Sequence, residues 1–113
     1  AAFLASTDLT HYGPMFGFEP AGRGEPGLRW AKHVNDRRFL ERVAQMDEQG
    51  VVPEALSSFN ACGSGAVAAM LSALADSGHA EYRELQHTTS AEQAPLDSDS
   101  LNAVGYVSAV FGN

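Results

Sequence analysis

The first fourteen residues, AAFLASTDLTHYGP, change character abruptly after residue 5. Residues 1–5 are small or apolar and predict a buried strand of the parallel type, which needs neighbours on both sides. Residues 6–12 then carry hydroxyls, a carboxylate, an imidazole and a phenol, and a Gly-Pro turn signal follows them. Ligands of open α/β sheets bind at the carboxyl ends of strands. The stretch therefore predicts an α/β fold with a candidate site directly after its first strand.

Asp8 and His11 are the candidate pair for chemistry in this stretch. An imidazole titrates near neutral pH, so it can move protons or bind a metal as the neutral ring. A carboxylate three residues away can hold that ring in one tautomer. The alternative is that Asp8 caps a turn and His11 is an ordinary loop histidine, because Asp-x-x-His is a short pattern that arises easily by chance.

Cys62, the single cysteine, precedes Gly-Ser-Gly and a small-residue helix expected over residues 66–76. The amides and dipole of a helix N-terminus stabilise a thiolate, which can act as a nucleophile, a redox group or a soft metal ligand. The alternative is a small buried hydrophobe, as free cysteines often are. The flanking glycines favour a functional role, because they permit close backbone approach to a ligand.

Apolar spacing predicts a largely helical segment over residues 28–46, with Asn35 or Asp36 capping its second part. Its Arg37-Arg38 pair is interpreted as a solvated face rather than an anion site. A shorter helix is expected over residues 54–59, directly after Pro53.

Two further strands are expected over residues 82–90 and 103–111, the latter rich in β-branched and aromatic residues. The first of them ends in polar residues, including Thr89 and Ser90, which we expect to join the polar cluster of residues 6–12 in one pocket. Gly105 lies inside the second and indicates a bulge or tight packing.

The length, composition and net charge of the chain limit the class of protein it can be. A chain of 113 residues with 44% hydrophobic residues forms a single domain with a real core. Its net charge of −7 argues against nucleic-acid binding. No apolar run reaches membrane-spanning length and no signal peptide is visible, and the single cysteine indicates a reducing, cytoplasmic compartment. About three strand candidates are few for an α/β core, so we expect either one part of a larger domain or a sheet completed by homo-oligomerisation.

Four linked motifs resemble MEMO-like proteins, known in prokaryotes as AmmeMemoRadiSam system protein B. They are STDLTHYGP at residues 6–14, ACG at 61–63, HTTS at 87–90 and VGY at 104–106. The resemblance covers essentially the whole chain and corresponds to the C-terminal part of the family's single domain. It implies a three-layer α/β/α sandwich related to class III (LigB-like) extradiol dioxygenases, which hold non-haem Fe(II) and open catechol rings.

The resemblance also implies site residues. Cys62 would be a metal ligand for iron or copper, His11 a second ligand or an acid/base group, and Asp8 a neighbour in the same pocket. The family's other metal ligands are histidines in the N-terminal half, outside this chain, so two ligands would hold a metal weakly. Further pocket positions carried over or grouped with these are Ser6, Thr10, Tyr12, Gly63, Thr89 and Ser90.

Three functions are compatible with these residues. The first is a metal-dependent redox or dioxygenase-like protein acting on a small molecule. The second is a non-catalytic module that binds a peptide or phosphorylated ligand in the same pocket. The third is a thiol enzyme with Cys62 as nucleophile and His11 as base. We rank the metalloprotein first and leave catalysis open; the system name further implies radical-SAM and AMMECR-type partners.

Overall fold

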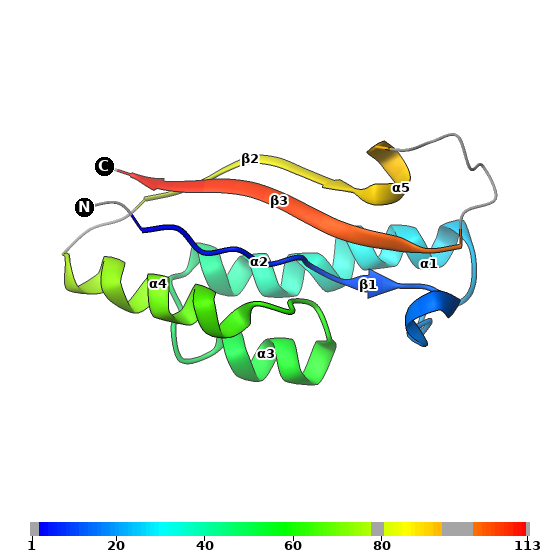
Figure 1. Cartoon of the computed structure of the whole chain (residues 1–113), viewed down its shortest axis with the longest axis horizontal. Coiled ribbons are helices and arrows are strands. Elements are labelled where there is room, and N and C mark those ends of the chain that lie inside the picture. Colours follow the sequence, from blue (N-terminus) through cyan, green and yellow to red (C-terminus); the bar gives the residue numbers. More distant parts are fainter. Residues whose placement is uncertain (1–2, 78–80, 94–100, 113) are drawn as a thin grey trace.

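The computed structural model describes residues 3–77, 81–93 and 101–112 and confirms an α/β fold. A run of helices lies between the short strand β1 and the two long strands β2 and β3 (Figure 1). In chain order the elements are β1 (His11–Tyr12), the 3-10 turn η1 (Pro14–Phe16), α1 (Glu25–Trp30), the π-helical turn η2 (Ala31–Asn35), α2 (Asp36–Ala44), α3 (Val51–Ser58), α4 (Ser64–Asp76), β2 (Glu81–Thr89), α5 (Ser90–Gln93) and β3 (Ala103–Gly112).

The sheet is antiparallel, with strand order β1-β3-β2. β2 and β3 pair along their whole length, from Glu81 opposite Gly112 to Thr89 opposite Gly105. β1 pairs with the start of β3, His11 lying opposite Val104. The parallel arrangement expected from the sequence is therefore wrong for the described strands.

The buried strand predicted over residues 1–5 is wrong for residues 3–5, and residues 1–2 lie outside the described part. Leu4 is 97% exposed, and residues 3–10 form no strand. The segment first meets β3 where the Leu9 amide donates to the Gly105 carbonyl (2.8 Å). An apolar run forms a strand only where a neighbouring strand accepts its hydrogen bonds, and the described residues supply none before Leu9.

α1, η2 and α2 follow one another without a break over residues 25–44, so the helix predicted over residues 28–46 forms but ends two residues earlier. The predicted cap is wrong, because Asn35 and Asp36 both have helical dihedral angles and neither side chain caps the helix. Both side chains are buried and hydrogen-bond to Thr10 instead. The predicted apolar stripe does face the core, where Phe39 and Val43 are buried.

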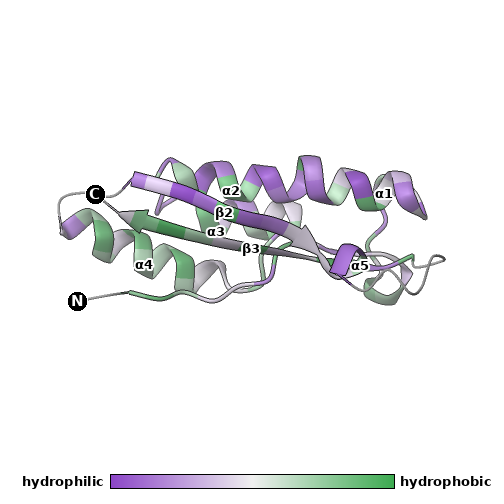
Figure 2. Cartoon of the chain, turned by 90° about the horizontal axis from the view of Figure 1, so that it is seen from above, coloured by the Kyte–Doolittle hydropathy of each residue, from purple (hydrophilic) through white to green (hydrophobic). Residues whose placement is uncertain are grey.

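The core lies between the sheet and the helices. In Figure 1 helices α1 to α4 all lie on one side of the β2–β3 pair, and Figure 2 shows that β2 consists mostly of hydrophilic residues. The described residues thus form two layers, and the three-layer sandwich stays a prediction. The buried core cluster consists of Leu9, Phe39, Leu40, Val43, Val51, Ala55, Val67 and Leu71.

Among the described residues, none of the helices combines the length and the apolar character needed to cross a membrane.

Candidate metal centre

Asp8, His11 and Cys62 come together although Cys62 is distant in sequence. Each offers one ligand atom, and these atoms all lie within 4.8 Å of one another. Nε2 of His11 lies 3.8 Å from Oδ2 of Asp8. Two ligands with metal bonds of about 2.0–2.3 Å lie at most about 4.6 Å apart across the ion, so these separations are close to those of a ligated metal.

The loop between α3 and α4 brings Cys62 to the segment that carries Asp8. The Cys62 amide donates to the Asp8 carbonyl (3.3 Å), and the Gly63 amide donates to Oγ1 of Thr7 (2.8 Å). A Cβ at Gly63 would lie 2.4 Å from the carbonyl oxygen of Ser6. Glycine is therefore required at 63, and the exposed Ser6 contributes its backbone rather than its hydroxyl to this contact.

His11 has one ring nitrogen without a hydrogen bond. Its Nε2 is buried and has no hydrogen-bond partner among the described residues. The ring lies against Phe16, with centroids 5.0 Å apart. A buried polar atom without a partner costs free energy, and such atoms in folded proteins often mark a site for an ion, a water or a ligand.

Cys62 lies two residues before Ser64, which begins α4, so its predicted position just before a helix is confirmed. Its thiol is free and exposed. The Sγ atom lies 3.9 Å from the Asp8 carbonyl oxygen and 4.0 Å from Oγ1 of Thr7. The alternative of a buried hydrophobe is therefore wrong, and the thiol is accessible to a metal or an electrophile.

Tyr12 and Thr10, two predicted pocket residues, are buried behind the cluster. Tyr12 is fully buried, and its hydroxyl donates to the Gly22 carbonyl and accepts from the Ala21 amide, both at 2.8 Å. The Thr10 amide donates to Oδ1 of Asp36 (2.9 Å). Both residues hold the backbone on which His11 sits, and neither side chain has a polar contact with Asp8, His11 or Cys62.

Thr89 ends β2 and Ser90 begins α5, both across β3 from the segment that carries His11. Thr89 pairs with Gly105 and lines a hollow of 270 Å³ together with Lys32 and Glu92. The lining of that hollow includes none of Asp8, His11 and Cys62. The hydroxyl of Ser90 accepts a hydrogen bond from the Val104 amide (3.0 Å). This end of β2 therefore meets β3 rather than the candidate ligands, and a pocket shared with Asp8, His11 and Cys62 stays a prediction.

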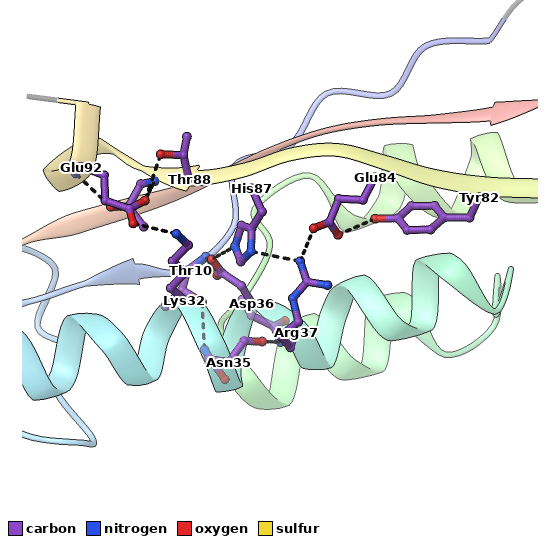
Figure 3. A network of polar contacts seen from close by, with 12 residues as sticks. Thr10, Lys32, Asn35, Asp36, Arg37, Tyr82, Glu84, His87, Thr88 and Glu92 are labelled. Carbon is purple, nitrogen blue, oxygen red and sulfur yellow. Dashed lines mark hydrogen bonds and ion pairs between the residues drawn. The ribbon is translucent and has the colours of Figure 1, made fainter.

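A partly buried polar network that the sequence did not indicate lies between β2 and α2 (Figure 3). Oδ2 of Asp36 lies 2.8 Å from Nε2 of His87, and Nδ1 of His87 lies 3.0 Å from the Arg37 guanidinium. A guanidinium only donates, so Nδ1 must accept and Nε2 must carry the proton that it donates to Asp36. Arg37 also donates to Glu84 (2.6 Å), so only Arg38 of the Arg37-Arg38 pair is a fully solvated side chain as predicted.

The network perturbs two ionisable groups on β2. Burial raises the pKa of Tyr82 to about 12, and the charge of Glu84 together with the hydrogen bond that Tyr82 donates to it acts in the same direction. Burial alone would raise the pKa of Glu84, but the hydrogen bonds from Arg37 and Tyr82 outweigh it and lower the pKa. Arg37 and Glu84 lie 47 residues apart, so the spacing of residues along the sequence could not predict their contact.

Comparison with known proteins places the chain in a class. A family profile described as Memo-like protein matches residues 1–110. A MEMO1 family protein of Methanopyrus kandleri is 32% identical over 110 residues, which are 96% of this chain and 32% of the relative. One from Methanothermobacter thermautotrophicus is 34% identical over 108 residues, 94% of this chain and 32% of the relative.

A third relative, the MEMO1 family protein of Thermococcus onnurineus, is 32% identical over 109 residues, 96% of this chain and 36% of the relative. The protein therefore belongs to the Memo-like family, which confirms the resemblance drawn from the motifs. The chain spans about a third of the length of these curated relatives.

Proposed function

We propose that Asp8, His11 and Cys62 bind a transition-metal ion, iron or copper, at the surface between β1 and the loop before α4. The observation that carries the proposal is the convergence of three different donor atoms within 4.8 Å, one of them the buried and unpartnered Nε2 of His11. A thiolate and an imidazole suit iron and copper better than hard cations such as magnesium or calcium.

Each residue has a distinct role in this proposal. Cys62 binds as the thiolate, and His11 binds as the neutral ring through Nε2. Asp8 is half exposed, and its Oδ2 lies 3.8 Å from Nε2 of His11, so its carboxylate is placed to complete the donor set. Phe16 shields one side of that ring from water.

A metal-dependent redox role on a small molecule is the activity we propose for the site. A bound iron or copper ion would supply redox and Lewis-acid chemistry. Asp8 is the group placed to accept or deliver a proton beside a bound molecule whenever it is not itself bound to the metal, since it is partly exposed and adjacent to Cys62. Three protein donors leave further coordination positions available for that molecule.

A non-catalytic binding module is the second candidate, favoured by exposed apolar side chains around the site. Phe16, which contacts His11, is 39% exposed, and Phe59, three residues before Cys62, is 66% exposed. Exposed aromatic residues of this kind are typical of surfaces that bind peptides or proteins. Such a module would bind its peptide equally well with and without metal. The radical-SAM and AMMECR-type partners and the cytoplasmic location are proposals that rest on the family resemblance and on composition.

The test is the metal content per chain after loading with Fe²⁺ or Cu²⁺ and removal of excess metal, measured by plasma mass spectrometry. We expect near-stoichiometric metal in the wild-type protein and its loss in Cys62→Ala and His11→Gln. The exposed His33 provides a matched control, because His33→Gln removes an imidazole away from the cluster and should retain the metal. Equal metal in wild-type and Cys62→Ala protein would contradict the proposal.

A further inference from the structure

Asn35 joins the two chain segments that carry the candidate ligands. It ends the π-helical turn η2 and is fully buried. Its Nδ2 donates to Oγ1 of Thr10 (3.1 Å), the residue before His11, as Figure 3 shows. The same nitrogen donates to the carbonyl of Ser58 (2.8 Å), the last residue of α3.

The backbone of Asn35 continues the connection toward Cys62. Its carbonyl accepts a hydrogen bond from Nδ2 of Asn60 (2.8 Å), and Asn60 lies two residues before Cys62. Asn60 is also fully buried. One residue therefore holds Thr10 on one side and the chain that leads into Cys62 on the other.

The local geometry of the helix makes this double contact possible. Asn35 and Asp36 are consecutive, yet both reach Thr10, Asn35 through the hydroxyl and Asp36 through the amide. π-helical turns inserted between α-helical segments change which side chains share a face, and they occur frequently at functional sites. Here η2 separates α1 from α2 directly at Asn35.

The arrangement carries a cost that an apolar residue would avoid. Within the described part of the chain, Oδ1 of Asn35 and Oδ1 of Asn60 are both buried without a hydrogen-bond partner. Buried amide oxygens in this state destabilise the native protein. The presence of asparagine at positions 35 and 60 is therefore explained by the hydrogen bonds that the Nδ2 atoms donate, not by a stabilising effect of these side chains on the core.

We propose that Asn35 is a positioning residue that sets the separation of His11 and Cys62. It acts through its hydrogen bonds with Thr10 and Asn60, while the hydrogen bond from the Gly63 amide to Thr7 links the two segments directly. The consequence for metal affinity rests on the proposed function, but the separation itself is a property of the metal-free protein. The two can therefore be tested separately.

The first test measures the separation without metal. Since Cys62 is the single cysteine, His11→Cys creates a pair of thiols across the site. Dibromobimane fluoresces when it links two nearby thiols, so its signal reports how often the two positions are within its reach. Adding Asn35→Leu or Thr10→Val to this variant should lower the cross-linking yield at least several-fold. Thr10→Ser, which keeps the hydroxyl acceptor, should restore it.

A control separates positioning from lost stability. Val51 is fully buried in the core, and none of its described hydrogen bonds involves Asn35 or Thr10. Val51→Ala destabilises the protein by leaving a cavity and should leave the cross-linking yield of the folded protein unchanged. If Asn35→Leu fails to fold, the cross-linking yields of Thr10→Val and Thr10→Ser are compared to test the positioning role of Asn35. An unchanged yield in Thr10→Val would overturn the proposal.

The second test uses cobalt(II), whose visible spectrum reports ligand geometry and whose thiolate charge-transfer band reports Cys62. We expect Asn35→Leu to weaken cobalt binding by about tenfold or more, as the loss of residues that orient metal ligands generally does. Its ligand-field bands should shift, while Val51→Ala keeps the wild-type spectrum. Wild-type affinity and spectrum in Asn35→Leu would overturn the positioning role. Absence of cobalt binding by the wild-type protein would overturn the proposed function, and the cross-linking yields would still decide the role of Asn35.

Discussion

Asp36 is the residue that links the helix, β1 and β2 through hydrogen bonds. Its carboxylate accepts from the Thr10 amide and from Nε2 of His87, and it is 1% exposed. Asp36→Asn keeps the size of the side chain but presents an NH₂ group to one of two donors, the N–H of His87 or the Thr10 amide. His87 cannot relieve the conflict by changing tautomer, because its other nitrogen already accepts from Arg37.

We therefore expect Asp36→Asn to lower the free energy of unfolding by about 1–3 kcal/mol, the usual cost of a buried group left unsatisfied. Guanidinium chloride unfolding followed by circular dichroism measures the change. Asp76, exposed at the end of α4, gives the control, because Asp76→Asn removes the same charge at the surface. Equal effects of the two substitutions would show that the buried network contributes nothing of its own.

Tyr82 gives a prediction for alkaline pH. Burial and the neighbouring Glu84 raise its pKa to about 12 in the folded protein. The unfolded chain loses this proton near its ordinary value of about 10. The folded state therefore binds the proton more tightly, and the stability that this contributes is complete below pH 10 and is lost between pH 10 and 12.

The measurement is the tyrosinate absorbance of wild-type protein minus that of Tyr82→Phe as pH rises. We expect a single transition with its midpoint near pH 12 in this difference, because the other tyrosines cancel. A difference that titrates near pH 10 would show that the hydroxyl is solvated in the native state and would contradict the contact with Glu84.

At the level of single residues, the local motifs identified the candidate ligands and missed what supports them. Asp8 and His11 lie three residues apart, so their pairing can be read from spacing. Asn35 and His87 contact partners 25 and 51 residues away, and no local pattern records such contacts. Asn35 and Asp36 were expected as a helix cap because that is what these residue types do most often beside a helix.

Among the elements, β3 approaches α2 closely at Gly105. A Cβ at this position would lie 2.3 Å from Oδ2 of Asp36. Gly105→Ala should therefore either displace β3 or break the Asp36 hydrogen bonds, and we expect it to lower the unfolding free energy by about 1–3 kcal/mol, as overpacking does.

Gly65 in α4 is the matched control, because a Cβ there meets nothing within 4 Å. Gly65→Ala should be neutral or stabilise the protein by up to about 1 kcal/mol, since alanine favours the helix. Thermal unfolding of both variants provides the comparison. A tolerated Gly105→Ala would mean that the sheet and helix have room to separate at this contact.

The elements that the sequence predicted well are those with a strong intrinsic pattern. The strands expected over 82–90 and 103–111 form as Glu81–Thr89 and Ala103–Gly112, and the helix expected over 66–76 forms as Ser64–Asp76. The apolar run at residues 1–5 failed because strand formation depends on a neighbour and not on composition alone. The antiparallel pairing of β2 with β3 could not be predicted from the sequence either, because it depends on how the chain between the two strands reverses direction.

On the scale of the whole molecule, β3 has one edge that is only partly covered. β1 pairs with its first two residues, and Gly105 also bonds to the segment before β1. On the same edge, residues 106–112 have no strand partner in the described part of the chain. This stretch, YVSAVFG, carries no charge, and Val110 is 47% exposed. Uncharged open edges pair readily with another strand, because their amides and carbonyls are unsatisfied.

We therefore expect the chain to self-associate through β3, in line with the oligomer predicted from the small number of strands. The net charge of −7 opposes contact between copies, and salt screens that repulsion, so association should increase with NaCl concentration. Val110 lies in the stretch that forms the open edge, and on the other side of β3 it is paired with Arg83 of β2. Val110→Glu places a charge in this stretch and should shift the protein to monomer in sedimentation velocity. Leu56→Glu, on the exposed face of α3, adds the same charge elsewhere and should have a much smaller effect. Equal effects of the two substitutions would assign the association to net charge, and a monomer at every salt concentration would rule out pairing through this edge.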